Sequence, residues 1–188
     1  DAAGEALDKA AAVLNLGYPG GPIIQKTAEE GNEKKINFPR ALKKESRSKW
    51  MYNYNRDLCF SFSGLKTSLV THINQLEDFP QKEELSDIAA SFQAAVIDAL
   101  IDRLTNAIDL YSIKSFACSG GVSLNSLLRS SLKKLSVSRN IPLLLSPPAL
   151  CTDNAAMIAG VAYEMYCYNN NTNEPTDVNS SLRLKDWN

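Results

Sequence analysis

A glycine turn lies where a predicted strand gives way to a predicted helix. Gly120 and Gly121 begin this turn and Asn125 ends it, within the string S-G-G-V-S-L-N at 119–125. Free backbone N–H groups and the helix dipole favour an anion at such a turn, so the string predicts a docking place for a phosphate or a nucleotide. It lacks the G-K-[ST] of a Walker A loop and the third glycine of the dinucleotide fingerprint. Because paired glycines also serve simple chain reversal, both interpretations stay open.

A carboxylate follows the second predicted strand in a similar position. Asp153 lies in the string C-T-D-N at 151–154, directly ahead of an apolar helix. As the N-cap of that helix, Thr152 or Asp153 would contribute about 1 kcal/mol. At a crevice across from the glycine turn, Asp153 could instead supply one oxygen ligand to a catalytic cation. A single carboxylate makes no metal site, so the residues alone leave both roles open.

Asp8, in the first predicted helix, precedes a second glycine turn. That turn has the sequence Y-P-G-G-P at 18–22. Its paired glycines, Gly20 and Gly21, can take positive φ and let another group approach the backbone closely. A carboxylate ahead of a glycine turn is typical of ribose recognition, and a solvated helix face explains Asp8 equally well.

Positive charge is concentrated between residues 33 and 49, where only two acidic residues, Glu33 and Glu45, oppose it. Aromatic residues follow directly at 50, 52 and 54, and a basic run beside aromatics suits phosphate contact with base stacking. A solvated loop with aromatics anchored in the core is the alternative. The basic residues are Lys34, Lys35, Arg40, Lys43, Lys44, Arg47 and Lys49.

Side chains for nucleophilic catalysis are scarce. His72 is the only histidine, and it lies in an amphipathic run at 67–75 that predicts a surface position. The cysteines lie far apart without a C-x-x-C pair, so we expect reduced thiols that are mostly buried. A Ser/His or Cys/His triad therefore has little support. The cysteines are Cys59, Cys118, Cys151 and Cys167.

Composition is that of an ordinary globular protein. The 188 residues are 44% hydrophobic and 22% charged, with a formal net charge of −1. This excludes a chain that is disordered or fibrous as a whole, and nothing global indicates a nucleic-acid or membrane partner. No apolar run is long enough to span a bilayer, and the first residues lack the order of a signal peptide. We expect a soluble, cytoplasmic protein, with a mitochondrial location as the alternative.

The candidate binding and metal-ligating residues lie between alternating strands and helices. Apolar spacing predicts helices at 1–16, 23–30, 85–108, 125–135 and 153–168, and strands at 113–118 and 142–146. Strands that alternate with helices across glycine turns indicate an α/β architecture. The polar tail from residue 169 is expected to fray. A domain seldom opens on an uncovered helix, so we expect the chain to be part of a longer protein.

Together these strings resemble the tRNA N6-adenosine threonylcarbamoyltransferase family, formerly named the glycoprotease family. They occur in the family's order and cover nearly the whole chain except the tail. The resemblance implies an actin-like, sugar-kinase-like α/β nucleotide-binding fold with helical insertions. The strings are G-E-A-L-D-K at 4–9 with Y-P-G-G-P at 18–22, F-P-R at 38–40, F-S-F-S-G-L-K-T at 60–67, S-G-G-V-S-L-N at 119–125 and C-T-D-N-A-A-M-I-A at 151–159.

The resemblance implies transfer of a threonylcarbamoyl group from threonylcarbamoyl adenylate to N6 of adenosine 37, in tRNAs that read codons beginning with A. Asp8 matches a position at the ribose and Asn125 one near the base. Gln25 stands where some relatives carry an acidic residue that contacts the substrate. The positions expected to hold the adenylate, or ATP, are Asp8, Gly21, Gln25, Gly120, Gly121 and Asn125.

Asp153 matches the family's carboxylate ligand to a divalent metal, iron or zinc. The resemblance implies that two histidines of an N-terminal half, which this chain does not contain, share that ion. The family's phosphate loop belongs to the same half. The ion would make the carbonyl of the mixed anhydride more electrophilic, so no protein nucleophile is required. We therefore expect catalytic residues outside this chain, and a chain that is inactive by itself.

The implied organisation is a C-terminal part at 1–170 and a flexible tail at 171–188. Within it, 1–111 is expected to be mostly helical with a basic loop at 33–49, and 112–170 to form a nucleotide- and metal-binding α/β lobe. Lys43, Lys44 and Arg47 are the residues expected to contact tRNA.

Implied partners are tRNA together with a paralogous actin-like subunit and an accessory ATPase in bacteria, or a second copy of the protein in an organelle. No membrane is expected among the partners. Two other functions stay open: a carbamoyltransferase or sugar kinase of the same fold, and a non-catalytic scaffold that binds tRNA or a partner.

Overall fold

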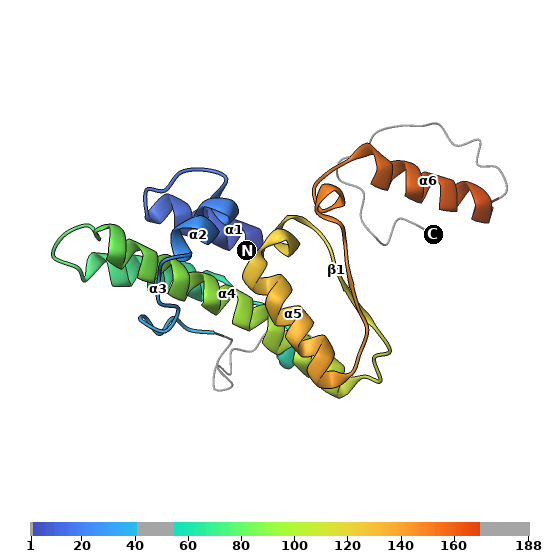
Figure 1. Cartoon of the computed structure of the whole chain (residues 1–188), viewed down its shortest axis with the longest axis horizontal. Coiled ribbons are helices and arrows are strands. Elements are labelled where there is room, and N and C mark those ends of the chain that lie inside the picture. Colours follow the sequence, from blue (N-terminus) through green and yellow to red (C-terminus); the bar gives the residue numbers. More distant parts are fainter. Residues whose placement is uncertain (1, 41–54, 170–188) are drawn as a thin grey trace. The chain divides into compact units, whose positions relative to one another are not determined.

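The computed structural model describes residues 2–40 and 55–169 (Figure 1). The chain forms two compact units, Asp1–Thr152 and Asp153–Asn188, and each is described by itself. The polar tail expected to fray from residue 169 lies almost wholly outside the described residues. The expected division at residues 111 and 112 stays a prediction.

Helices dominate the first part of the first unit. They are α1 (Ala3–Val13), α2 (Gly20–Ala28), α3 (Ser63–Asn74) and α4 (Lys82–Leu110). The predicted helix at 85–108 is thus confirmed as most of α4, which packs against the other three. Their apolar faces meet in one core that includes Leu7, Leu14, Ile24, Phe38, Leu69 and Phe92.

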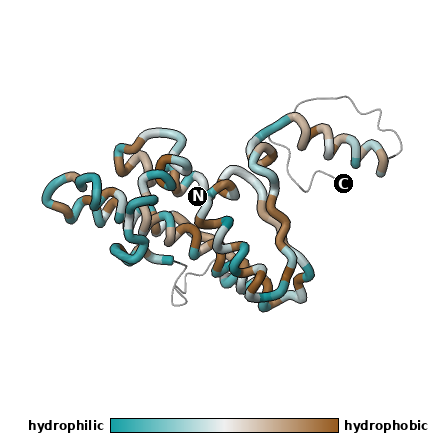
Figure 2. The backbone as a smooth tube through the Cα atoms, in the orientation of Figure 1, coloured by the Kyte–Doolittle hydropathy of each residue, from teal (hydrophilic) through white to brown (hydrophobic). Residues whose placement is uncertain are grey.

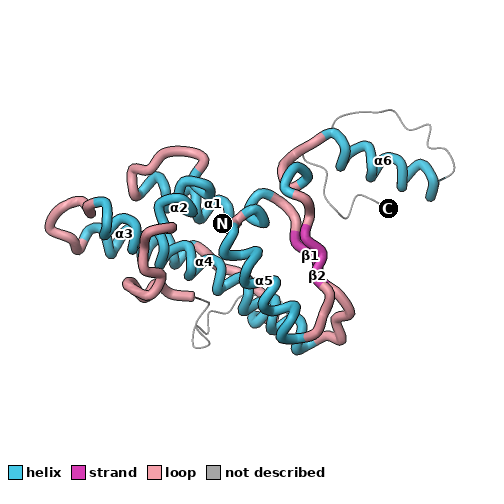
Figure 3. Tube along the Cα trace, in the orientation of Figure 1, coloured by secondary structure: helices cyan, strands magenta, loops and turns pink. Residues whose placement is uncertain are grey.

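A short parallel sheet follows α4. Strand β1 (Phe116–Cys118) leads through a 3-10 turn, η2 (Gly121–Leu124), into α5 (Ser126–Arg139), and the chain returns as β2 (Leu143–Leu145). Phe116 pairs with Leu143 and Cys118 with Leu145. Figure 3 shows the two strands side by side, and Figure 2 shows the apolar residues that they carry. The α/β prediction is confirmed as a mostly helical chain with a small parallel sheet.

A second core holds this β–α–β segment against the C-terminal half of α4. Apolar side chains of α5 point to it because they recur at helical spacing. The chain leaves α5 at Asn140, which adopts a left-handed conformation with φ of 53° and so closes the helix. The buried members of this core are Ile97, Ile108, Phe116, Leu128, Leu132 and Leu135.

The second unit contains α6 (Ala155–Asn169). Its start is capped by Asn154, whose Oδ1 accepts a hydrogen bond from the Met157 backbone at 3.0 Å. The sequence prediction that Thr152 or Asp153 caps this helix is therefore wrong, because the helix begins two residues after Asp153. Within the described residues, no helix combines the length and the apolar character needed to cross a bilayer.

The predicted basic segment is joined to α4 at Arg40, and a turn that follows the segment is also held by α4. Within the segment, Arg40 Nε lies 2.6 Å from Asp98 Oδ2, and Arg40 Nη1 donates to Asn37 Oδ1 at 3.0 Å. Arg40 is thus paired with a carboxylate of α4. Lys43, Lys44 and Arg47 lie outside the described residues.

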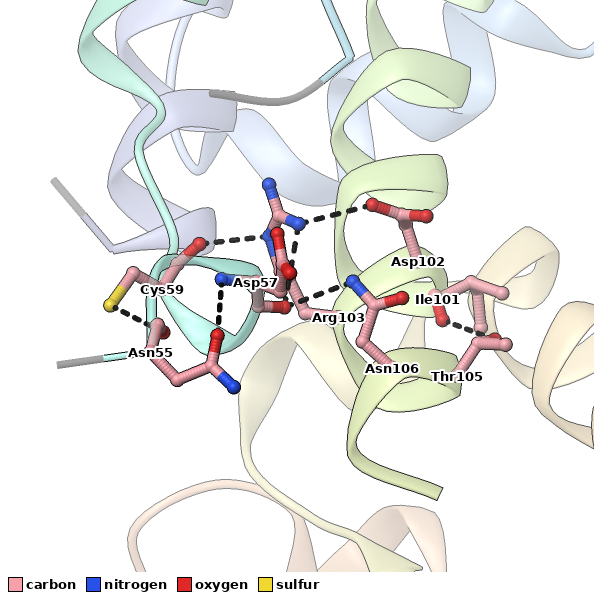
Figure 4. Close-up of polar contacts among 8 residues, drawn as sticks. All are labelled: Asn55, Asp57, Cys59, Ile101, Asp102, Arg103, Thr105 and Asn106. Atoms are coloured by element: carbon pink, nitrogen blue, oxygen red, sulfur yellow. Dashed lines mark hydrogen bonds and ion pairs between the residues drawn. The ribbon is translucent and has the colours of Figure 1, made fainter. Parts of the chain in front are cut away.

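After the segment, the chain makes a 3-10 turn, η1 (Arg56–Leu58), that Arg103 of α4 holds (Figure 4). Arg103 is only 7% exposed. Its Nε donates to the Cys59 carbonyl at 2.9 Å, and its Nη1 to the Asp57 carbonyl at 3.4 Å. Asn106, one turn further along α4, also donates to the Asp57 carbonyl, at 3.0 Å. A buried guanidinium with several acceptors fixes the position of this turn.

Candidate nucleotide site

A cavity of about 540 Å³ lies in the first unit, between α1, the start of α2 and the glycine turn before α5. It brings together five of the six residues predicted to hold the adenylate, from three segments far apart in the sequence. Gly120 lies outside its lining. The five are Asp8, Gly21, Gln25, Gly121 and Asn125.

The walls of this cavity are largely apolar. Leu7, Val122 and Leu124 contribute aliphatic surface, and Tyr18 stands at the cavity with 83% of its surface exposed. A cavity of this size, with mostly apolar walls and a few polar groups, is typical of small-molecule sites. Asp8, Gln25 and Asn125 are among the polar residues that line it.

Asp8 connects α1 to the start of α2. Its Oδ1 accepts a hydrogen bond from the Gly20 N–H at 2.8 Å, so one carboxylate oxygen caps α2 while the side chain lines the cavity. The interpretation of Asp8 as part of a solvated helix face is thus wrong.

The paired glycines at 20 and 21 lie in the first turn of α2, which begins three residues earlier than predicted. Positive φ was expected there and instead occurs at Gly17 and Gly120. The expected close approach is confirmed at Gly20, where an added Cβ would lie 2.5 Å from the Asp8 Cα.

Two side-chain oxygens occupy the N-terminus of α5. Gln25 Oε1 accepts from the Ser126 N–H at 2.8 Å, and Asn125 Oδ1 accepts from the Leu128 N–H at 3.1 Å. These two N–H groups are therefore already paired, and they are not open to the phosphate that the glycine turn predicts from sequence. The contacts instead position Gln25 and Asn125 at the cavity wall.

The glycine turn itself has a conformation that requires glycine at one position. Gly120 has φ of 87° and ψ of 168°, a region that side chains with a Cβ rarely adopt. An added Cβ at Gly121 meets nothing within 4 Å, so Gly121 leaves space in the cavity and is not needed for packing. Gly120 therefore shapes the turn, and Gly121 keeps the wall open.

Arg129 of α5 ties this turn to the end of β2, a role that sequence reasoning missed. Its Nε donates to the Ser123 carbonyl at 2.6 Å, and its Nη2 donates to the Ser146 carbonyl at 2.8 Å. Sequence offers no signal for this contact, since the two carbonyls come from separate loops.

Gln93 was also missed. It is a buried residue of α4, and its Oε1 accepts from Asn125 Nδ2 at 2.7 Å. The available signal was a carboxamide inside the otherwise apolar stretch of α4 between Phe92 and Ala94.

The thiols and the histidine differ in burial from what the sequence predicts. All four cysteines are free, but only Cys151 is buried, so the expectation of mostly buried thiols is wrong. Burial raises the pKa of the Cys118 thiol, although the Arg129 charge acts in the opposite direction. The raised pKa keeps Cys118 protonated at neutral pH. His72 is half-buried, not on the open surface, and its ring packs edge-on to Phe38 with centroids 6.0 Å apart.

A metal ion would need ligands from elsewhere. Within the described residues, no three His, Cys, Asp or Glu side chains gather to form a site. Asp153 fits as one carboxylate ligand, and it belongs to the second unit.

Comparison with known proteins places this chain in a family. The family model described as tRNA N6-adenosine threonylcarbamoyltransferase matches residues 1–160. A protein of that name from Syntrophus aciditrophicus (strain SB) is 42% identical over 183 residues, which is 97% of this chain and 50% of that protein.

Relatives with the same name occur in clostridia. The one from Clostridium botulinum (strain Kyoto / Type A2) is 42% identical over 98% of this chain, and the one from Clostridium kluyveri (strain NBRC 12016) is 41% identical over 98%. In both cases the match spans 51% of the relative. The chain thus spans about half the length of the curated relatives it matches, and it belongs to the tRNA N6-adenosine threonylcarbamoyltransferase family.

Proposed function

We propose that the protein containing this chain transfers a threonylcarbamoyl group from threonylcarbamoyl adenylate to N6 of adenosine 37, in tRNAs that read codons beginning with A. One observation supports the proposed role of this chain in that reaction: five predicted substrate residues from three separate segments line a single cavity. Membership of the family supports the reaction.

The cavity suits the adenylate half of that substrate. Asp8 has a second carboxylate oxygen beyond the one that caps α2, and it can accept hydrogen bonds from ribose hydroxyls. Apolar walls cover the base, and Asn125 contacts its edge. Gly21 and Gly121 let the nucleotide approach the backbone closely.

In the reaction, the N6 amine of the tRNA attacks the carbonyl carbon of the mixed anhydride. A C–N bond forms, the bond from that carbon to the phosphate oxygen breaks, and the amine loses a proton as AMP leaves. The part of this chain is to hold the leaving nucleotide in one orientation, which raises the rate through positioning. Asp153 would supply one ligand to a divalent ion, iron or zinc, that polarises a carbonyl when bound.

Architecture supports an actin-like, sugar-kinase-like fold for the whole protein. The cavity lies at the turn that follows the carboxyl end of β1, which is where open α/β sheets bind ligands. In bacteria we propose a paralogous actin-like subunit and an accessory ATPase as partners, and in an organelle a second copy of the protein.

The nucleotide assignment predicts weaker AMP binding in two variants of the full-length protein. Gly121→Val fills open space in the cavity wall, so we expect at least about a tenfold rise in Kd. Asn125→Ala removes a polar contact and the α5 cap, and should raise Kd while lowering stability by about 1 kcal/mol. Calorimetric titration and thermal melting measure both effects.

Gly64→Val is the matched control for this experiment. An added Cβ at Gly64 also meets nothing within 4 Å, but Gly64 lies on α3 outside the cavity. This variant should bind AMP like the parent. Parent-like affinity in Gly121→Val and Asn125→Ala would show that the turn is only structural.

The tRNA assignment predicts a change in salt dependence. Replacing Lys43, Lys44 and Arg47 with Ala should lower tRNA affinity and reduce the slope of log K against log salt by roughly 0.9 for each lost contact on duplex regions. A filter-binding salt series on the parent and the triple variant measures this slope. Identical slopes would mean that these charges are solvated and do not contact tRNA.

The metal assignment predicts separate effects for two neighbouring residues. Asp153→Ala in the full-length protein should lose bound metal and transfer activity with little change in melting, since Asp153 does not cap α6. Asn154→Ala removes that cap, which lowers stability by about 1 kcal/mol, and should retain the metal. Elemental analysis and thermal melting distinguish them. Full metal loading in Asp153→Ala would exclude the ligand role.

A further inference from the structure

Gln93 is a buried carboxamide that the chemistry described so far does not use. It lies on α4 among buried apolar neighbours and is only 7% exposed. A buried amide is unfavourable unless it is hydrogen-bonded. Its Oε1 has a partner in Asn125, which is itself 7% exposed and donates from Nδ2 at 2.7 Å. The contact joins the interior of α4 to the cavity wall.

This contact fixes which end of the Asn125 carboxamide is oxygen and which is nitrogen. Oδ1 accepts from the Leu128 N–H, and Nδ2 donates to Gln93. A flip would place the Nδ2 hydrogens against the Leu128 N–H and would remove the acceptor that this N–H requires. The Leu128 N–H selects one of the two flip orientations of the Asn125 carboxamide. The contact with Gln93 then holds the plane of the carboxamide in that orientation.

A carboxamide has two donor hydrogens and two acceptor lone pairs. The two contacts use one of each, so Asn125 retains one donor and one acceptor for a ligand in the cavity. At the edge that carries N7, adenine presents an acceptor at N7 beside a donor at N6, whereas guanine presents two acceptors at N7 and O6. A fixed donor–acceptor pair that faces this edge therefore matches adenine and not guanine.

We propose that Gln93 is a positioning residue that determines nucleotide specificity, because it fixes the Asn125 carboxamide in the orientation that selects adenine over guanine. The inference rests on the adenylate site proposed above. Gln93 acts through Asn125, and it needs no contact with the nucleotide.

The test compares AMP with GMP in calorimetric titrations of the full-length protein. The parent should prefer AMP by between about 5- and 150-fold, the range expected of one bidentate contact to a base. In Gln93→Met the thioether is a weak acceptor of similar size, so the ratio should fall towards one. Gln93→Glu retains a carboxyl acceptor for Asn125 and should keep most of the preference. If Gln93→Met does not fold, the variant Gln93→Asn is used in its place. Its shorter side chain withdraws the acceptor from Asn125.

Ser91→Ala is the matched control. Ser91 is another buried polar residue of α4, but its hydroxyl donates to the Asn32 carbonyl and accepts from the Ile36 N–H, outside the cavity. This variant should lose stability and keep the AMP-to-GMP ratio. A second measurement needs no ligand: hydrogen exchange at the Leu128 N–H, relative to the other amides of α5, should be faster in Gln93→Met and unchanged in Ser91→Ala.

The outcomes separate the two proposals. If the parent protein binds neither nucleotide, the proposed adenylate site is wrong, and amide exchange at Leu128 still tests whether Gln93 fixes Asn125. If the parent prefers AMP and Gln93→Met has the same AMP-to-GMP affinity ratio, only the proposed role of Gln93 is wrong. Equal weakening of both nucleotides would assign Gln93 to packing and also overturn the proposal.

Discussion

Gly20→Ala is expected to destabilise the protein and weaken AMP binding together, while Gly21→Ala leaves stability intact. An added Cβ at Gly20 would lie 2.5 Å from the Asp8 Cα and 2.7 Å from the Leu7 carbonyl oxygen. Both are backbone atoms, so the two helices must move apart, at a cost of about 3 kcal/mol. The shift also breaks the contact from the Gly20 N–H to Asp8, and we expect the Kd for AMP to rise at least about tenfold.

Gly21→Ala is the matched comparison, because its added Cβ meets nothing within 4 Å. Alanine favours a helix over glycine by up to about 1 kcal/mol, so melting should be unchanged or higher. The methyl group lies at the wall of the cavity and should weaken AMP binding without affecting the fold. Thermal melting and calorimetric titration of both variants test this contrast. Equal melting of the two would mean that α1 and α2 adjust to the extra carbon.

Loss of the Arg103 guanidinium is expected to lower the free energy of unfolding by about 3 kcal/mol, because hydrogen bonds to buried charged groups are strong. In Arg103→Met the Cys59 carbonyl loses the donor described here, whereas the Asp57 carbonyl keeps Asn106. For a domain of this size the loss corresponds to roughly 6 to 12 °C in melting temperature. Arg103→Lys should not restore stability, since an ammonium cannot replace the planar fork.

Arg40→Ala provides the control for that measurement. Arg40 also pairs with α4, through Asp98, but their side chains are 36% and 53% exposed. Pairs as exposed as this one contribute at most about 1 kcal/mol. Denaturant unfolding of both variants compares the contacts of Arg40 and Arg103 with each other directly. A smaller loss in Arg103→Met than in Arg40→Ala would contradict the assignment of Arg103 as the stronger anchor.

Sequence predicts the regular elements well because their signals are local. The spacing of apolar residues from Leu85 to Ile108 repeats along the whole of α4, and each repeat depends only on neighbours three or four positions away. The glycine turn between β1 and α5 is predicted for the same reason, since Gly120 needs its positive φ whatever surrounds it. Such features can be identified without knowledge of the partner elements.

The contacts that build the site depend on residues far apart in the sequence. The start of α2 was predicted three residues late because its cap, Asp8, comes from the preceding helix. Gln93 and Arg103 are polar residues of α4. The periodicity of this helix predicts only on which face each residue lies. Their partners, Asn125 and the turn at 56–58, follow from the packing of separate segments. Family resemblance supplied Asp8, Gln25 and Asn125, but their contacts came from the structure.

The continuity of α4 has a consequence for how two ligands would be aligned. Gln93 supports the nucleotide cavity, and Arg103, ten positions later, holds the turn beyond the basic segment. Along an α-helix this separation corresponds to about 15 Å, without a loop in between. If the cavity holds the adenylate and the basic segment binds tRNA, as proposed, the helix would set the distance between the two ligands. Inserting one residue between positions 93 and 103 would lengthen it by only about 1.5 Å, but would rotate the two ends by about 100° relative to each other.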